Sequence, residues 1–137
     1  LSDSLFNAED VAEAVLDEAN LQIANSNLGV TDVSSSFVRN SNWSSWYDIH
    51  AYKFMGFIFL DLSAYHLGSG VNNNRIIYTI SDSDLHPTAN HYFPTSAYQG
   101  DTASAVEIRT NGDVYLGTPD NIGDIDFYMN INGFYRL

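Results

Sequence analysis

Cysteine is absent from this 137-residue sequence, and basic residues are scarce. Without Cys the chain has no disulfide, no thiolate nucleophile and no Cys-ligated zinc or iron–sulfur site. Only 5 Lys and Arg face 17 Asp and Glu, which gives a net charge of −12. So little positive charge disfavours binding to nucleic-acid phosphates or to an anionic membrane, and no apolar run is long enough to span a bilayer. We therefore expect no nucleic-acid partner and no membrane insertion.

The first quarter of the chain differs from the rest. Residues 1–33 contain no Lys or Arg, and the chain starts at Leu1 without Met or a leader, so we expect a longer protein whose N-terminal part is missing. Helix-forming residues dominate residues 8–24. Apolar residues recur at helical spacing at Leu5, Ala12, Leu16, Ala19, Ile23 and Val30.

Two interpretations of this helix remain open. It could lie along its own domain as a single amphipathic helix, or it could be a neck that bundles with copies of itself. The second is favoured, because the acidic helix has no Lys partners within residues 1–33 and a helix of about 17 residues is marginal alone in water. We therefore expect a helical oligomerisation neck over residues 1–33 and a separate domain over residues 34–137.

The second region is expected to be β throughout. The strongest strand signal covers Tyr52–Leu62, where both faces are largely apolar, as in a central strand covered on both sides or covered by another subunit. A buried helix is the alternative, but Gly56 and the many aromatic residues favour a strand.

Two Asn-Gly pairs predict β-hairpins. Residues 103–110 alternate apolar and polar side chains, Asn111-Gly112 is a strong two-residue turn signal, and Asp113–Leu116 returns. Asn132-Gly133 predicts a second turn between the last two strands, and Leu85–Thr95 is expected to be loop with short extended pieces. Short strands at this spacing are typical of an antiparallel β-sandwich or a jelly-roll-like domain.

Catalytic and metal sites find little support. No nucleophile motif is present, and the residues Asp120–Asp126, which could bind calcium, lack the twelve-residue loop pattern. Scattered carboxylates such as Asp61 and Glu107 could serve a glycosidase, but any acidic β protein offers such a set. We expect no catalytic residue, no metal ligand and no cofactor. The four His are scattered, without metal-site spacing: His50, His66, His86 and His91.

Aromatic residues among polar ones are the more informative feature. Trp46 stands in a Ser- and Asn-rich stretch close to Asp48 and His50, and Arg109 and Tyr115 flank the first Asn-Gly turn. Aromatic rings cover the apolar face of a pyranose, while carboxylate and guanidinium groups bind its hydroxyls. These five residues are candidate saccharide-binding residues.

Residues 50–137 also show a family resemblance, in order and spacing. Its segments are Phe54–Leu62, Leu85–Pro87, Ala105–Leu116 and the ending Gly133–Leu137. A helical neck followed by such a β head resembles the C-terminal part of the receptor-binding proteins of siphophages that infect Gram-positive cocci, of the lactococcal and streptococcal type.

The resemblance implies a homotrimer whose heads bind host cell-wall polysaccharide or another surface saccharide without catalysis. It also implies a place at the distal tail tip or baseplate of the virion, joined to other tail proteins through the missing N-terminal part. Glu107 stands roughly where the family has a saccharide-contacting Asp, and it becomes the sixth candidate. Ala105, Gly117 and Met129 stand where the family has His, Trp and Arg.

Three other functions remain open. A glycan-degrading tail enzyme would need two carboxylates about 5–9 Å apart across a groove. A purely structural tail or spike module would bind no glycan. An extracellular trimeric cytokine-like domain fits a sandwich, but such chains seldom begin with a helical neck.

Overall fold

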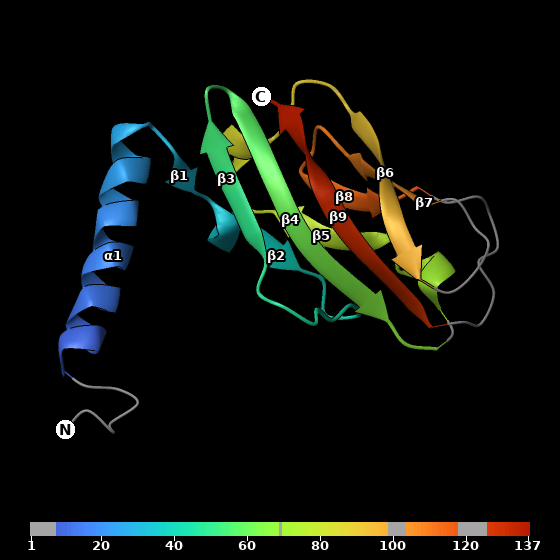
Figure 1. Ribbon diagram of the computed structural model, residues 1–137. Coiled ribbons are helices and arrows are strands. Elements are labelled where there is room, and N and C mark those ends of the chain that lie inside the picture. The colour runs from blue at the N-terminus through green and yellow to red at the C-terminus, as the bar shows by residue number, and fades with distance from the viewer. Residues whose placement is uncertain (1–7, 69, 99–103, 118–125) are drawn as a thin grey trace. The chain divides into compact units, whose positions relative to one another are not determined.

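The chain forms two compact units, Leu1–Thr31 and Asp32–Leu137. The first contains a helix and the second is almost entirely β (Figure 1). The computed structural model describes residues 8–68, 70–98, 104–117 and 126–137.

Helix α1 spans Ala8–Asn27, so the predicted helix over residues 8–24 is confirmed and continues slightly further. Its last turn contains no basic side chain to interact with the helix dipole. Several large apolar side chains along it are exposed: Val15, Leu16, Leu21 and Ile23. Among the described residues, no helix is long and apolar enough to cross a membrane.

The strands range from two to ten residues. Within the described residues, three single-turn 3₁₀ helices connect some of them (Ser34–Ser36, Val71–Asn73 and Ser83–Leu85). The strands are β1 (Thr31–Asp32), β2 (Phe37–Arg39), β3 (His50–Phe54), β4 (Phe57–His66), β5 (Ile76–Ile80), β6 (His91–Tyr98), β7 (Ser104–Ile108), β8 (Asp113–Leu116) and β9 (Phe127–Arg136).

The strands form two sheets that share β6. Residues 96–98 of β6 pair with β9 in sheet A, whose order is β1-β3-β4-β9-β6. Residues 91–95 pair with β7 in sheet B, whose order is β6-β7-β8-β5-β2. The pairs among β2 to β9 are antiparallel. Figure 1 shows sheet A in front of sheet B, which confirms the predicted antiparallel β-sandwich.

The core lies between the two sheets. Alternate residues of the central strands β4 and β9 point into it, because successive side chains of a strand face opposite sides. Sheet A contributes Ile58, Leu60, Leu62, Phe127, Met129, Ile131 and Tyr135, and sheet B contributes Ile77, Ile80, Val106, Ile108, Val114 and Leu116. The remaining residues of each strand form the two outer faces of the sandwich.

Residues Tyr52–Leu62 were expected to form one continuous strand, and this prediction is wrong because the chain turns back within them to form a hairpin. Strands β3 and β4 pair from Phe54 opposite Phe57, joined only by Met55 and Gly56. Both turn residues have positive φ, 49° and 80°, as a type I′ turn requires. The sequence concealed the turn because Met is an unusual residue in the left-handed region.

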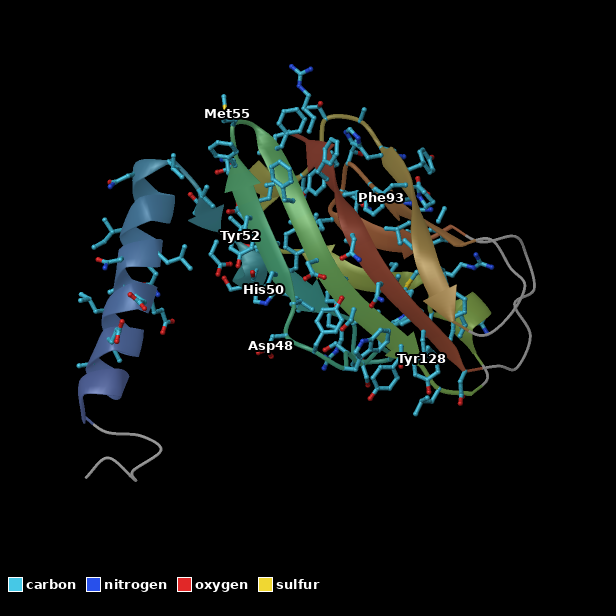
Figure 2. All side chains as sticks on the ribbon, viewed as in Figure 1. Asp48, His50, Tyr52, Met55, Phe93 and Tyr128 are labelled. Atoms are coloured by element: carbon cyan, nitrogen blue, oxygen red, sulfur yellow. The ribbon has the colours of Figure 1, made fainter. Side chains whose placement is uncertain are left out.

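The second predicted turn, at Asn132-Gly133, is also wrong. Strand β9 runs through both residues, and Gly133 pairs with Leu60 of β4. A Cβ at Gly133 would lie 3.3 Å from the ring of Phe93, whose side chain Figure 2 labels beside β9. Glycine at this position therefore permits close packing of an aromatic ring and does not mark a turn.

Candidate functional site

Three of the six predicted binding residues come together on the outer face of sheet B. Glu107 of β7 lies directly opposite Tyr92 of β6 and Tyr115 of β8. Their strand neighbours Val106 and Ile108 are buried in the core, so Glu107 and its partners lie on the outer side. Arg109 follows β7 on the same side as Glu107. We name Asn90, Tyr92, Glu107, Arg109 and Tyr115 the Glu107 cluster.

Glu107 is the centre of the hydrogen bonds in this cluster. Its Oε1 accepts from Asn90 Nδ2 (3.0 Å) and from the hydroxyl of Tyr92 (3.1 Å). Its Oε2 accepts from a guanidinium nitrogen of Arg109 at 3.2 Å, which is also an ion pair. The carboxylate is therefore fixed in one orientation, although the cluster lies at the surface.

Arg109 connects the carboxylate to an aromatic ring. Its guanidinium carbon lies 3.6 Å from the centroid of the Tyr115 ring, in a cation–π arrangement. Burial opposes the charge of Arg109, but the hydrogen bond and the negative charge of Glu107 outweigh it and raise the pKa of Arg109. The guanidinium is therefore a permanent cation, and one of its faces is occupied by Tyr115.

The turn between β7 and β8 positions this cluster. The predicted hairpin is confirmed, but its turn has three residues, Thr110 to Gly112, because the Arg109 amide donates to the Asp113 carbonyl (2.9 Å). Only Gly112 has positive φ there (91°), as in a type I turn followed by a glycine bulge. The amide of Thr110 donates to Asn90 Oδ1 at 3.0 Å, which ties the turn to the start of β6.

Of the other three predicted residues, Trp46 and His50 lie on the outer face of sheet A, and Asp48 lies between them in the chain. Trp46 stacks on Tyr65 of β4 with ring centroids 5.9 Å apart. His50 begins β3, and its ring is parallel to that of Tyr52 at 6.1 Å. Asp48 is exposed in the segment before β3 (Figure 2). The six candidates are therefore divided between opposite faces of the sandwich and cannot form one binding site.

Two members of the cluster, Asn90 and Tyr92, were missed by the sequence analysis. The segment Leu85–Thr95 was expected to be mostly loop, and Pro94 supported that expectation. In the structure β6 starts at His91 and places Tyr92 opposite Glu107. The alternation of His91, Tyr92 and Phe93 in the sequence is consistent with a strand, but only the pairing with β7 identifies Tyr92 as a neighbour of Glu107.

The histidines and carboxylates are dispersed. The four His lie in separate surroundings, and no three His, Asp or Glu side chains within the described ranges could hold a metal ion. Most of the calcium candidate Asp120–Asp126 lies outside the described residues; Asp126 itself accepts from the Gly68 amide at 2.7 Å. Glu107 and Asp61, two carboxylates considered for a glycosidase, lie on opposite faces of the sandwich.

Comparison with known proteins gives a fold match. No family model and no curated protein sequence matches this chain. Whereas the sequence resemblance pointed to lactococcal and streptococcal phages, a structural match is to a protein of a Listeria phage. This chain is similar in fold, at a TM-score of 0.58 and 15% identity over 97% of its own length and 79% of the other chain, to the receptor binding protein (gp15) of Listeria phage PSA.

Proposed function

We propose that the chain is the neck and head of a phage receptor-binding protein that binds host-surface saccharide reversibly and without catalysis. The observation that carries the proposal is the fold similarity to a phage receptor binding protein along nearly the whole chain. The neck would correspond to residues 1–33 and the head to residues 34–137. In this proposal the protein is joined to other tail proteins of the virion, and the head lies at the distal end of the tail.

The Glu107 cluster has the chemistry that a saccharide site requires. Tyr92 is 68% exposed and offers an aromatic face, while Glu107 and Arg109 offer an acceptor and donors for sugar hydroxyls. The hydrogen bonds from Asn90 and Tyr92 hold the carboxylate in place before any ligand binds. Preorganisation reduces the entropy that binding costs, which is important for a ligand that water competes with strongly.

The outer face of sheet A provides a surface for assembly of three copies. At the end near the β3–β4 turn, Phe59 and Phe134 are 42% and 59% exposed, and their ring centroids lie 5.8 Å apart. Phe57 joins them, at 5.9 Å from Phe134. A contiguous group of phenylalanines, two of which are exposed, is typical of a protein–protein interface. A homotrimer that buries this group and the apolar residues of α1 would also increase avidity for a repetitive glycan.

Binding to whole cells tests this function. The fluorescently labelled chain is incubated with a panel of Gram-positive cocci and Listeria strains, with and without prior removal of their wall polysaccharide. We expect binding to at least one strain and loss of that binding after removal of the polysaccharide. Glu107→Gln, which keeps the size of the side chain, is expected to weaken binding. Absence of binding to every strain, or binding that survives removal of the polysaccharide, would contradict the proposal.

A further inference from the structure

We propose a second saccharide contact on sheet A, in which the rings of Trp46, Tyr65 and Tyr128 form a platform for the apolar face of a pyranose. This inference rests on the proposed function but uses a different face of the head from the Glu107 cluster. We call these three residues the aromatic platform. Figure 2 shows Tyr128 at the end of sheet A opposite to Met55.

The platform consists of rings in mutual contact. Tyr65 and Tyr128 face each other across β4 and β9, with ring centroids 5.6 Å apart and planes within 23° of parallel. Trp46 lies 5.9 Å from Tyr65 and 5.8 Å from Tyr128. It also lies 6.0 Å from the Tyr47 ring in an edge-on arrangement. It is nevertheless 44% exposed, so part of the indole is accessible to a ligand.

The segment that carries Trp46 is firmly attached to the sandwich. Three residues before Trp46, Trp43 is buried in the core and donates its indole N–H to the Asn74 carbonyl at 2.6 Å. Ser44 and Tyr65 exchange two backbone hydrogen bonds of 2.9 and 2.8 Å, and the Trp46 amide lies 3.3 Å from Ser63 Oγ. The indole is therefore held in position before a ligand arrives, as binding sites for small molecules require.

Polar groups lie directly beside the platform. The Tyr47 hydroxyl is 3.0 Å from Asp61 Oδ1 and 3.3 Å from Asn130 Oδ1. Burial, together with the hydrogen bond to Asp61, raises the pKa of Tyr47 to about 12, so this hydroxyl remains a donor to Asp61 well above neutral pH. The exposed Asp61 and the amide of Asn130 can bind sugar hydroxyls at the edge of a stacked ring.

The composition of the platform distinguishes it from the phenylalanine group on the same sheet. Phe59 and Phe134 form a paired row six residues along β4 from the Tyr65 and Tyr128 row, about 20 Å away. Phenylalanine rings without hydroxyls suit a dry contact with a second copy of the chain. Tyr and Trp rings beside a carboxylate and an amide suit a ligand that is apolar on one face and hydroxylated at its edge.

The two tryptophans make the inference directly testable by NMR. The ¹⁵N-Trp-labelled chain has two indole N–H signals: Trp46 reports the platform, and buried Trp43 is an internal control for the fold. The probes are methyl pyranosides of glucose, galactose, N-acetylglucosamine and rhamnose, with glycerol as a hydroxylated control that lacks a ring face. We expect at least one pyranoside to shift the Trp46 signal. Glycerol should not shift it, and the Trp43 signal should stay unchanged with every probe.

Two NMR results would overturn the inference. One is a Trp46 signal that no pyranoside moves, or that glycerol moves equally. The other is a Trp46 signal that changes with protein concentration alone, because it would place a second copy on the platform. Trp46→Ala is further expected to weaken cell binding roughly five- to tenfold, with an unchanged Trp43 signal to show that the variant is folded. Cell binding that depends on Glu107 but not on Trp46 would refute the platform and leave the proposed function intact.

Discussion

The imidazole of His86 lies against the backbone of Gly112, with its Nε2 2.7 Å from the carbonyl oxygen of Ile80. Gly112 in turn donates its amide to the Arg109 carbonyl, and the Ile80 amide donates to the Gly112 carbonyl. This contact fixes the turn that follows β7. Because the same turn carries Arg109 and Thr110, the packing of His86 supports the geometry of the Glu107 cluster.

Gly112→Ala is expected to destabilise the head by about 2 kcal/mol or more. Gly112 has φ of 91°, where a side chain is strained, and a Cβ there would overlap the ring of His86. Urea denaturation followed by fluorescence gives the change in the free energy of unfolding. The double variant Gly112→Ala/His86→Ala removes the overlap but not the strain. Gly112→Ala should therefore lower the free energy of unfolding less in the His86→Ala background than in the original chain. A Gly112→Ala variant as stable as the original chain would contradict this account of the turn.

Met55→Asn is expected to stabilise the chain by roughly 0.5–1 kcal/mol, because Asn tolerates the left-handed region better than Met. Met55 has φ of 49° in the β3–β4 turn and is 79% exposed, so the substitution removes no core contact. Met55→Leu serves as the control and should be neutral, because Leu does not relieve the left-handed conformation. Equal melting temperatures for all three proteins would argue against strain at Met55.

The sequence was sufficient where local pattern and tertiary environment agree. Asp113–Leu116 alternates regularly beside a glycine turn, and β8 has these bounds. It was insufficient where the reason for a residue lies across space. Asn132-Gly133 has the sequence of a turn, but Gly133 instead makes room for the ring of Phe93. Met55 conceals a turn because apolar residues precede and follow it in the sequence.

The candidate site shows the same division. Glu107 and Tyr115 could be assigned to one face from the alternation around the Asn-Gly turn, and they are paired in the structure. Trp46 was grouped with them by chemistry alone, and it lies on the other sheet. Sequence alternation gives the face of a strand but not which sheet a neighbouring loop covers, because that depends on long-range pairing such as that of Ser44 with Tyr65.

Stability is expected to fall at alkaline pH because of Tyr78. Its buried hydroxyl donates to the Ser63 carbonyl at 2.6 Å, and burial raises its pKa to about 12. The unfolded chain releases this proton near pH 10, so the stabilisation is complete below pH 10 and declines as the pH rises towards 12. Tyr78→Phe should flatten this decline in urea denaturation between pH 9 and 11.5. An unchanged slope in Tyr78→Phe would refute the assignment.

The phenylalanine group on sheet A predicts the oligomeric state. Light scattering should give a mass near three times the 15.2 kDa of one chain. Phe134→Asp should reduce this mass, since a charge at that position would be buried at the interface at high cost. Val38→Asp is the matched control, because Val38 is also an exposed apolar residue but belongs to β2 of sheet B. A single-chain mass for the original protein at micromolar concentration would exclude the trimer.

Arg109→Lys is expected to weaken cell binding about tenfold while changing the free energy of unfolding by less than about 1 kcal/mol. A lysine keeps the charge, but it cannot both stack on Tyr115 and direct a planar fork towards Glu107 and a glycan. Arg39→Lys is the matched control, since Arg39 lies in β2 and bonds to Ser45 through its guanidinium. Because the glycan would contact the guanidinium directly, the loss should appear mainly as faster dissociation in surface-plasmon measurements on immobilised wall polysaccharide. Equal dissociation rates for Arg109→Lys and Arg39→Lys would show that the Glu107 cluster is a structural feature of sheet B and that the saccharide binds elsewhere on the head.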